Sequence, residues 1–415
     1  MREYLPQELL DFLHIAAGVA NARGQRLYLV GGAVRDLLLQ RRPRLDFDLV
    51  VEGDAPTLAR QLAKASGEEV VVHRRFGTAK FHCGDVSIDL VTARSETYPR
   101  PGALPEVRPG TIGDDLLRRD FSINAMAIDL SPATFGQLLD PHGGRSDLER
   151  GLIRILHDRS FIDDATRILR ALRYEQRLCF KLEPNTERLL RQNASMLDTI
   201  SGDRIRHELE LIFREEYPER ILERAEGLGV LQALHPSLRG SGWLAGRFQK
   251  ARQKGISDPA LYLLLLIYHL SEEENERLIA RLNIVGELGR NMRQVLRLKR
   301  DLSALADPAV LPSATYRLLK HYPPQAIAAC ALASEAATIR SHLELYLGRL
   351  RYVKLSLDGE DLKKMGVTPG PRLGRMLEEL RLAKLDGKVS TKGEEEALVR
   401  RWLRQKGGKE IGAAM

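Results

Sequence analysis

The sequence predicts an α+β protein, in which a mixed sheet with helices is followed by a region built only of helices. Short apolar runs alternate with helical patterns between about residue 27 and residue 140. Past residue 150 the strand signals nearly vanish and leucine-rich helical patterns take over. A chain of 415 residues is long enough for several domains. We expect four: a head at 1–150, a neck at 151–228, a body at 229–350 and a tail at 351–415.

The composition is that of a soluble globular protein that favours a polyanionic partner. Hydrophobic residues make up 43%, charged residues 29%, and the net charge is +8. Cys83, Cys179 and Cys330 form no disulfide or metal pattern, which favours a reducing compartment. The charged residues of the first helix argue against a signal peptide, and the longest apolar run, 260–268, is too short to span a bilayer. We expect a cytoplasmic protein that binds no membrane.

The first elements of the head form a candidate phosphate site. In chain order they are an apolar strand at 27–30, a turn at Gly31 and Gly32, a helix at 33–40 and a strand at 45–51. A glycine turn that opens a helix directs backbone N–H groups and the positive end of the helix dipole toward one point, which suits a phosphate. Arg35 in the first helical turn could reach the same anion.

Two carboxylates of the second strand form a candidate magnesium site. Asp46 and Asp48 are two positions apart, so both side chains point to one face of the strand. They repel each other, and Mg²⁺, which prefers a few carboxylate oxygens plus substrate phosphates, would relieve the repulsion. A glycine pair alone is often only a turn, and Asp-x-Asp alone is often a loop or a cap. Together, in this order, they favour phosphoryl or nucleotidyl transfer.

Two head motifs resemble those of a known family. GGAVRD at 31–36 with DFD at 46–48 resembles the head of the class II tRNA nucleotidyltransferases, which include CCA-adding, CC-adding and A-adding enzymes and bacterial poly(A) polymerases. The resemblance implies a polymerase-β-like nucleotidyltransferase head with a third carboxylate on a neighbouring strand. Asp89 is the candidate, and an exposed strand aspartate with no such role is the alternative.

The second head motif is RRDFSINAMA at 118–127, which resembles the family's RRDFTINAMA. The resemblance implies that Arg119 binds nucleotide phosphate, that Asp120 binds the ribose and that Asn124 supports the site. A charged turn before an apolar strand would be the simpler reading of these residues taken alone.

The neck carries a periodic charged motif. A carboxylate and three guanidiniums recur every three residues, at Asp164, Arg167, Arg170 and Arg173. On one helix they would share a drifting face, which most often is only a solvated surface. The segment resembles the family's E-D-x-x-R motif, with Asp163 in place of the usual Glu. The resemblance implies that Asp164 and Arg167 hydrogen-bond the base of the incoming nucleotide. It also implies that Arg170 and Arg173 stabilise the triphosphate or the helix.

Three further segments carry weaker signals. Four prolines and two glycines predict little regular structure at 92–112, where the resembled family has a flexible segment, and PGALP at 101–105 favours the A-adding subgroup. DRIRHELELIF at 203–213 resembles the family's motif R-x-x-x-E-L, which assigns a bracing role to Arg206 and Glu210.

The tail predicts a helix, a turn and a second helix over 358–385, and it also resembles the family's tail. Pro371 suits the first turn of the second helix. Arg372 and Arg375 would bind an RNA phosphate beside the free N–H groups of that turn. A packing hairpin without an RNA role is the alternative.

The resemblance implies a tRNA nucleotidyltransferase that adds CCA, or only its terminal A, from ATP, with CTP as a second candidate substrate. Mg²⁺ at Asp46 and Asp48 would activate the RNA 3′-hydroxyl for attack on the α-phosphate and neutralise the pyrophosphate. Gly32, Arg35 and Arg119 would contact the triphosphate. Two alternatives stay open: a poly(A) polymerase, and an RNA-binding protein with an inactive head.

Overall fold

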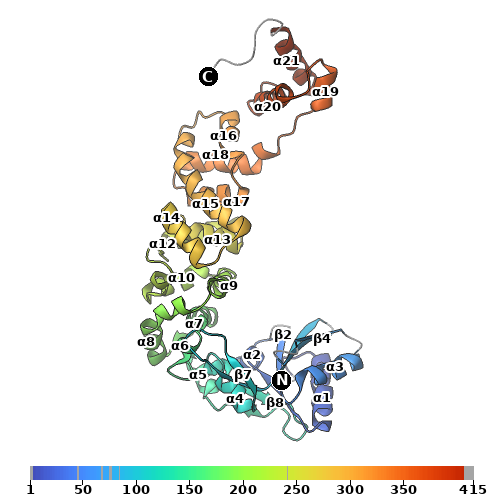
Figure 1. The fold of residues 1–415 in the computed structure, drawn as a ribbon, viewed down its shortest axis with the longest axis vertical. Coiled ribbons are helices and arrows are strands. Elements are labelled where there is room, and N and C mark those ends of the chain that lie inside the picture. The colour runs from blue at the N-terminus through green and yellow to red at the C-terminus, as the bar shows by residue number, and fades with distance from the viewer. Residues whose placement is uncertain are drawn as a thin grey trace. The chain divides into compact units, whose positions relative to one another are not determined.

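The computed structural model describes residues 3–43, 46–66, 69–73, 77–83, 85–240 and 242–405 (Figure 1). The chain divides into two compact units, Met1–Ser241 and Gly242–Met415. The first unit combines a sheet with helices, as predicted, and the second is helical. The finer division into head, neck, body and tail stays a prediction.

A seven-stranded mixed sheet forms the core of the first unit, in the order β3-β4-β5-β2-β1-β8-β9. Its strands are β1 (Arg26–Val30), β2 (Asp46–Glu52), β3 (Val70–His73), β4 (Thr78–Cys83), β5 (Val86–Thr92), β8 (Ala127–Asp129) and β9 (Leu138–Leu139). β2 and β5 run parallel, whereas β1 is antiparallel to both β2 and β8. The structure describes the second strand, β2, from Asp46 onward. The sequence predicted that this strand starts at Leu45, which lies outside the described residues.

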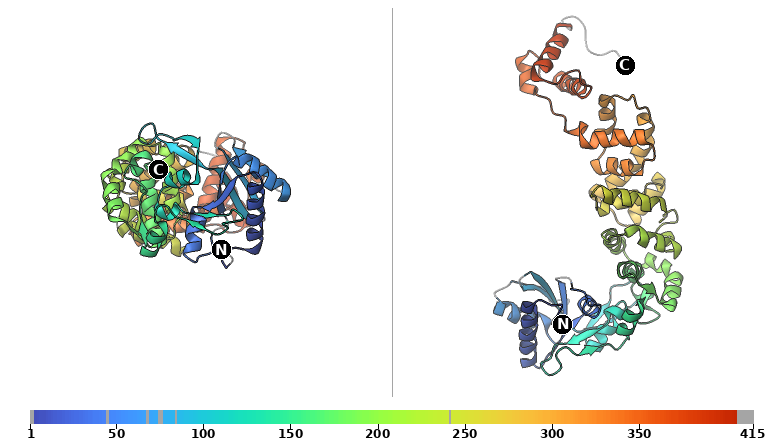
Figure 2. Two further views of the ribbon diagram at one scale, coloured as in Figure 1. Left: turned by 90° about the horizontal axis from the view of Figure 1, so that it is seen from below. Right: turned by 180° about the vertical axis from the view of Figure 1, so that it is seen from behind.

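Helices cover both faces of this sheet. They are α1 (Gln7–Ala22), α2 (Gly32–Leu38), α3 (Ala55–Ser66) and α4 (Ile112–Leu117). α1 and α3 contact each other as well as the sheet, and Figure 2 shows them from two further sides. On the α4 face, Ile112 and Leu116 pack against Tyr28 and Val30 of β1. Paired residues of neighbouring strands share a face, so Asp48, the partner of Val30, lies on the α4 face.

The segment 92–112 has more regular structure than the sequence predicted. It forms a hairpin of β6 (Arg94–Thr97) and β7 (Glu106–Pro109). The expectation failed because the prolines are compatible with this hairpin: three lie between the strands and Pro109 ends the second one, where no ladder N–H is lost. The connecting turn sits on the neck, where the Gly102 N–H donates to the Ile162 carbonyl at 3.3 Å.

The neck is not wholly helical, which corrects the prediction. Two short parallel strands, β10 (Leu152–Ile153) and β11 (Lys181–Leu182), pair within it. Strands of two residues are too short to produce an alternating sequence pattern. The other elements are α5 (Gly144–Arg150), α6 (Ser160–Asp163), α7 (Thr166–Leu178), α8 (Pro184–Gln192), α9 (Gly202–Phe213), α10 (Pro218–Gly227), α11 (Val230–Leu234) and the 3₁₀ helices η2 (Ser122–Asn124) and η3 (Ala194–Thr199).

The charged segment of the neck is broken, whereas the sequence predicted one helix. Asp164 has an extended backbone, with φ −136° and ψ 98°, and separates α6 from α7. Its Oδ1 accepts hydrogen bonds from the Thr166 N–H at 3.0 Å and the Thr166 hydroxyl at 2.7 Å. A short aspartate side chain competes with the helix for its own backbone in this way. Asp164 therefore lies at the start of α7 instead of on one helical face with the arginines.

Within its described residues, 242–405, the regular elements of the second unit are all helices. Its helices are α12 (Gly242–Gln253), α13 (Pro259–Leu266), α14 (Glu272–Arg281), α15 (Gly286–Asp301), α16 (Pro312–Leu319), α17 (Pro324–Ala333), α18 (Ala337–Gly348), α19 (Gly359–Lys364), α20 (Pro371–Leu385), α21 (Lys392–Gln405), η4 (Leu302–Leu305) and η5 (Leu350–Tyr352). The helix–turn–helix of the tail is present, and Pro371 stands in the first turn of α20, as predicted. No described helix has the length and apolar character needed to cross a membrane.

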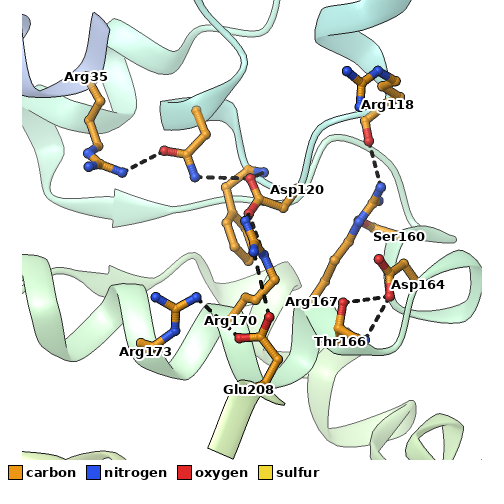
Figure 3. A network of polar contacts seen from close by, with 12 residues as sticks. Arg35, Arg118, Asp120, Ser160, Asp164, Thr166, Arg167, Arg170, Arg173 and Glu208 are labelled. Carbon is orange, nitrogen blue, oxygen red and sulfur yellow. Dashed lines mark hydrogen bonds and ion pairs between the residues drawn. The ribbon is translucent and has the colours of Figure 1, made fainter. Parts of the chain in front are cut away.

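An ion pair between a buried carboxylate and a half-buried arginine joins the head to the neck. Asp120 follows α4, and its Oδ2 accepts from Arg170 of α7 through Nε at 2.9 Å and Nη2 at 2.6 Å. Arg170 also faces Glu208 of α9, whose Oε1 lies 3.7 Å from Nη1 (Figure 3). Burial opposes ionisation of Asp120, yet the attraction of Arg170 and the hydrogen bond from Asn124 outweigh it and hold the pKa of this carboxyl below its usual range.

Replacing Asp120 by Asn should therefore destabilise the first unit in a pH-dependent way. A carboxyl whose pKa is lowered on folding stabilises the fold above its unfolded pKa of about 4, and this contribution is lost as the pH falls through the folded pKa. We expect Asp120→Asn to lower the free energy of unfolding by about 3 kcal/mol at pH 7, with a smaller difference at pH 3. Urea unfolding followed by circular dichroism measures both.

The matched control is Asp203→Asn, since Asp203 pairs with Arg206 at 2.7 Å on an exposed surface. That change should cost under about 1 kcal/mol. Equal losses in the two variants, or a loss at Asp120 that does not vary with pH, would contradict the assignment of Asp120 as a buried counter-ion.

Candidate active site

Three charged residues stand in one row across the sheet. Asp48 of β2 is the register partner of Asp89 of β5, and Asp89 is the partner of Lys80 of β4. Asp46 lies two residues before Asp48 and shares its face. The sequence predicted the Asp46–Asp48 pair and a third carboxylate at Asp89, and the register places Asp89 beside Asp48. The sequence analysis missed Lys80, whose Nζ lies 3.2 Å from Asp89 Oδ2 and 3.9 Å from Asp46 Oδ1.

The surroundings of Asp48 disfavour its negative charge. Neighbouring protein atoms raise the pKa of the Asp48 carboxyl by desolvation, and repulsion from Asp89 and Asp46 raises it further. Arg119 and Lys80 act in the opposite direction. A carboxylate that is crowded by other carboxylates gains from a nearby cation.

The residues present suit a hard divalent cation. Within the described residues, no three His, Cys, Asp or Glu side chains converge closely enough to hold an ion by themselves. Mg²⁺ does not need such a cage, because it binds through one or two carboxylates plus substrate phosphates and water. The Lys80 ammonium between Asp46 and Asp89 indicates that a cation is accommodated at these oxygens.

The glycine turn admits the charged side chains around it. Gly31 has φ +71° and ψ −135°, a conformation that other residues rarely adopt. A Cβ atom there would lie 2.9 Å from Arg119 Nη1 and 3.4 Å from Asp48 Oδ2. A side chain at this position would thus displace the arginine that faces Asp48. α2 is shorter than the helix predicted at 33–40, since it ends at Leu38.

A fully buried carboxylate positions two arginines of the second head motif. Asp115 of α4 has no exposed side-chain surface. It accepts from Arg118 Nη2 at 2.6 Å and from Arg119 Nη2 at 2.9 Å. Arg118 Nη1 also lies 3.3 Å from Glu96 of the hairpin, whose other carboxylate oxygen accepts from the Tyr98 hydroxyl at 2.9 Å. The hairpin and the arginines are therefore connected through Glu96.

One cavity collects residues of the sheet, the hairpin and the neck. Its volume is about 470 Å³. The predicted residues that line it are Gly31, Gly32, Asp48, Arg119, Asp120, Asn124, Asp164, Arg167 and Arg170. The lining also includes Glu96, Tyr98, Arg118, Thr166 and Tyr174, none of which was predicted as a site residue. Head motifs and neck motif thus face the same space, although more than a hundred residues separate Gly31 from Asp164.

Four predicted residues lie outside the lining of this cavity: Asp46, Asp89, Arg35 and Arg173. The first two belong to the carboxylate row, next to Asp48. Arg35 is buried and donates to Asn124 Oδ1 at 2.8 Å, so it contacts a residue of the cavity lining without lining the cavity itself (Figure 3). Arg173 is likewise buried and donates to Glu208 at 3.2 Å. Both guanidiniums lie over the Tyr174 ring, 5.4 and 5.3 Å from its centroid.

Hydrogen bonds from neighbouring residues hold Asp164 and Arg167, the proposed base-reading pair, in place. Arg167 donates to the Ser160 hydroxyl through Nη1 and to the Arg118 carbonyl through Nη2, each at 2.7 Å. Ser160 thus orients Arg167. Arg204 of α9 donates to Asp164 Oδ1 at 2.7 Å. Within the described part of the chain, the hydrogen bonds to the Asp164 carboxylate all engage Oδ1 and leave Oδ2 for a ligand.

The arginine and glutamate of the last neck motif that contact the site lie two residues before the predicted pair. R-x-x-x-E-L fits the sequence at Arg204 and Glu208 as well as at Arg206 and Glu210. Arg204 and Glu208 point toward the site, where they contact Asp164 and Arg170, respectively. Arg206 instead pairs with Asp203 in the same helix, on an exposed surface. The motif itself was visible, but the sequence offered two registers.

The predicted RNA contacts of the tail lie in the second unit. Arg372 and Arg375 are exposed in the first turns of α20. Exposure is compatible with an RNA phosphate contact, which stays a prediction.

Comparisons with known proteins agree with the fold and the motifs. Residues 27–154 match a family model described as "Poly A polymerase head domain". Residues 179–240 match one described as "Probable RNA and SrmB- binding site of polymerase A". Over 97% of this chain, the structure resembles that of the Thermotoga maritima CCA-adding enzyme complexed with tRNA, with a TM-score of 0.79 and 32% identity over 97% of that chain.

Curated relatives include three A-adding tRNA nucleotidyltransferases. Those of Aquifex aeolicus and Geobacter sulfurreducens are 39% and 32% identical over 86% and 95% of this chain, which spans only 44% and 47% of their length. That of Halalkalibacterium halodurans is 34% identical over 94% of this chain and 92% of its own length. The chain belongs to the class II tRNA nucleotidyltransferase and poly(A) polymerase family.

Proposed function

We propose that this protein is a tRNA nucleotidyltransferase that adds the terminal A to CC-ended tRNA, with ATP as the nucleotide. The observation that carries the proposal is the shared cavity, in which Asp48 of the sheet and the Asp164–Arg167 pair of the neck face one space. The tRNA in the complex of the Thermotoga relative supports the RNA substrate, and the A-adding names of three relatives support the nucleotide.

The carboxylate row is the proposed site of the chemistry. Asp46 and Asp48 would hold Mg²⁺, with Asp89 beside them. Mg²⁺ bound there would lower the pKa of the RNA 3′-hydroxyl and neutralise charge on the leaving pyrophosphate. The hydroxyl oxygen attacks the α-phosphate, a phosphodiester bond forms and the bond to pyrophosphate breaks. Arg119, fixed by Asp115 and facing Asp48, would bind the triphosphate as a permanently charged donor.

The neck is the proposed reader of the base. Asp164 Oδ2 would accept a hydrogen bond from the exocyclic amine of adenine, and Arg167 would donate to a ring nitrogen. A base without this donor and acceptor pattern would leave buried groups unpaired, which disfavours it. Because Thr166 and Arg204 hold Oδ1, the other oxygen stays oriented without a nucleic-acid template.

Incorporation on three tRNAs tests the proposed activity. The tRNAs end before CCA, after the first C and after CC, and ATP and CTP are supplied separately and together. We expect one A on the CC-ended tRNA with ATP alone and no extension of the other two, read at single-nucleotide resolution on a denaturing gel. We expect this outcome because three relatives are A-adding enzymes by name. The Asp164–Arg167 pair alone would suit cytosine as well as adenine, since both bases present an exocyclic amine beside a ring nitrogen.

The other outcomes assign other activities. Completion of all three tRNAs with both nucleotides would replace A addition by full CCA addition. Long homopolymeric tails on an unrelated RNA would instead identify a poly(A) polymerase. Tight tRNA binding without incorporation would leave only the inactive RNA-binding alternative.

Loss of either metal carboxylate should abolish transfer without loss of RNA binding. We expect Asp46→Ala and Asp48→Ala to lower the rate of A incorporation by about a thousandfold or more, because the charges that build up in the reaction are no longer balanced. The dissociation constant for tRNA should stay within about twofold, because basic residues elsewhere bind the RNA backbone. Asp11→Ala, an exposed change in α1, serves as the control. Activity retained in either carboxylate variant would refute the metal assignment.

A further inference from the structure

Lys80 occupies a position that the proposed reaction does not explain. It is the register partner of Asp89, so the sheet itself fixes its side chain on the carboxylate face. The ammonium hydrogen-bonds Asp89 Oδ2 at 3.2 Å and lies 3.9 Å from Asp46 Oδ1. It thus contacts Asp46, a proposed metal ligand, and Asp89, the register partner of Asp48.

We propose that Lys80 is a built-in counter-ion, which holds the Asp46, Asp48 and Asp89 carboxylates together before divalent cations bind and then competes with those cations for the same oxygens. The inference rests on the proposed function in one respect, that these carboxylates bind a divalent cation.

The first argument is electrostatic. Like charges at directly opposed positions of neighbouring strands destabilise a sheet, and Asp48 and Asp89 are opposed in this way. The Lys80 ammonium, which hydrogen-bonds Asp89 and lies near Asp46, offsets part of this repulsion. Lysine side chains are charged at neutral pH, and the hydrogen bond to Asp89 Oδ2 at 3.2 Å directs this charge to the carboxylates.

The second argument is that Lys80 can leave. Its side chain is 46% exposed, and its ammonium ends a flexible four-carbon stem. Asp115 and Asp120, by contrast, are buried. Asp115 accepts four hydrogen bonds from Arg118 and Arg119, and Asp120 accepts two from Arg170. Of these positively charged side chains, Lys80 is therefore the one that another cation can displace most easily.

Competition has a thermodynamic consequence. A cation that binds Asp46 competes with the ammonium for this carboxylate, so the apparent affinity includes the loss of the Lys80 contact. Removing one positive charge close to a doubly charged ion should strengthen its binding about five- to tenfold after solvent screening. If Lys80 did not interact with the metal site, its replacement would leave the affinity for the divalent cation unchanged.

Manganese binding without nucleotide or RNA tests the proposal. Mn²⁺ is titrated into the full chain, and the free ion is followed by electron paramagnetic resonance. We expect Lys80→Met, which keeps the length of the side chain, to bind Mn²⁺ with a dissociation constant about five- to tenfold lower than that of the wild type. Lys254→Met is the matched control, because Lys254 also pairs with a carboxylate, Glu344, but lies in the second unit. Its Mn²⁺ affinity should equal that of the wild type.

Thermal unfolding gives a second readout that does not depend on activity. In EDTA, Lys80→Met should melt below the wild type, because the carboxylates lose their counter-ion. Saturating Mg²⁺ should close that gap. A Lys80→Met variant with unchanged or weaker Mn²⁺ binding, or with a gap that Mg²⁺ does not close, would overturn the proposal.

Asp48→Ala separates this failure from failure of the proposed function. If Asp48→Ala abolishes Mn²⁺ binding while Lys80→Met leaves it unchanged, only the role of Lys80 is refuted. If wild-type binding is absent or does not depend on Asp48, the metal site and the role of Lys80 are both refuted.

Discussion

The ion pair between Asp120 and Arg170 is the contact on which the site depends. Asp120 belongs to the loop after α4, which also carries Arg119, whereas Arg170 belongs to α7, whose first turn carries Arg167. Two hydrogen bonds to the buried Asp120 carboxylate fix the distance between these segments. The carboxylate row and the base-reading pair consequently face one cavity. The ribose contact that the resemblance implies for Asp120 stays a prediction.

The site concentrates charges that the fold alone does not balance. Four guanidiniums, those of Arg35, Arg170, Arg173 and Arg177, lie over the ring of Tyr174. Glu208 and Glu215 neutralise part of this charge from the neck. In the sheet, three carboxylates lie on one face of the neighbouring strands β2 and β5, with Lys80 close to two of them. A nucleotide triphosphate together with a divalent cation would complement both sides at once, which explains why such a strained distribution of charge is retained.

The sequence predicted the chemistry of the site better than its supports. Asp46 and Asp48 were predicted because strand periodicity and short motifs are local signals, whereas Asp89 was predicted from the resemblance to the family. The register brings Asp48 and Asp89 together. Asp115, Glu96 and Arg204 were missed, since a buried carboxylate or a bracing arginine has no local pattern. Lys80 was missed for the same reason, because its role arises only from pairing between β4 and β5.

The errors in the fold also have local physical causes. The helix predicted through Asp164 breaks because that side chain captures the amide and hydroxyl of Thr166. The sequence did not predict the hairpin at 94–109, because its prolines suggested a loop. These prolines occupy positions that a short two-stranded sheet tolerates. The R-x-x-x-E-L motif fits two registers, and only the orientation of α9 distinguishes them.

A double-mutant cycle tests most directly whether head and neck act as one site. The efficiency of A incorporation, kcat/KM for ATP on CC-ended tRNA, is measured for the wild type, Asp120→Asn, Arg170→Gln and the double variant. If the ion pair aligns the two halves, the first substitution already removes what the second would remove, so the effects should be non-additive by about 1.5 kcal/mol or more. Additive effects would contradict the account, because they would mean that Asp120 and Arg170 contribute to catalysis independently.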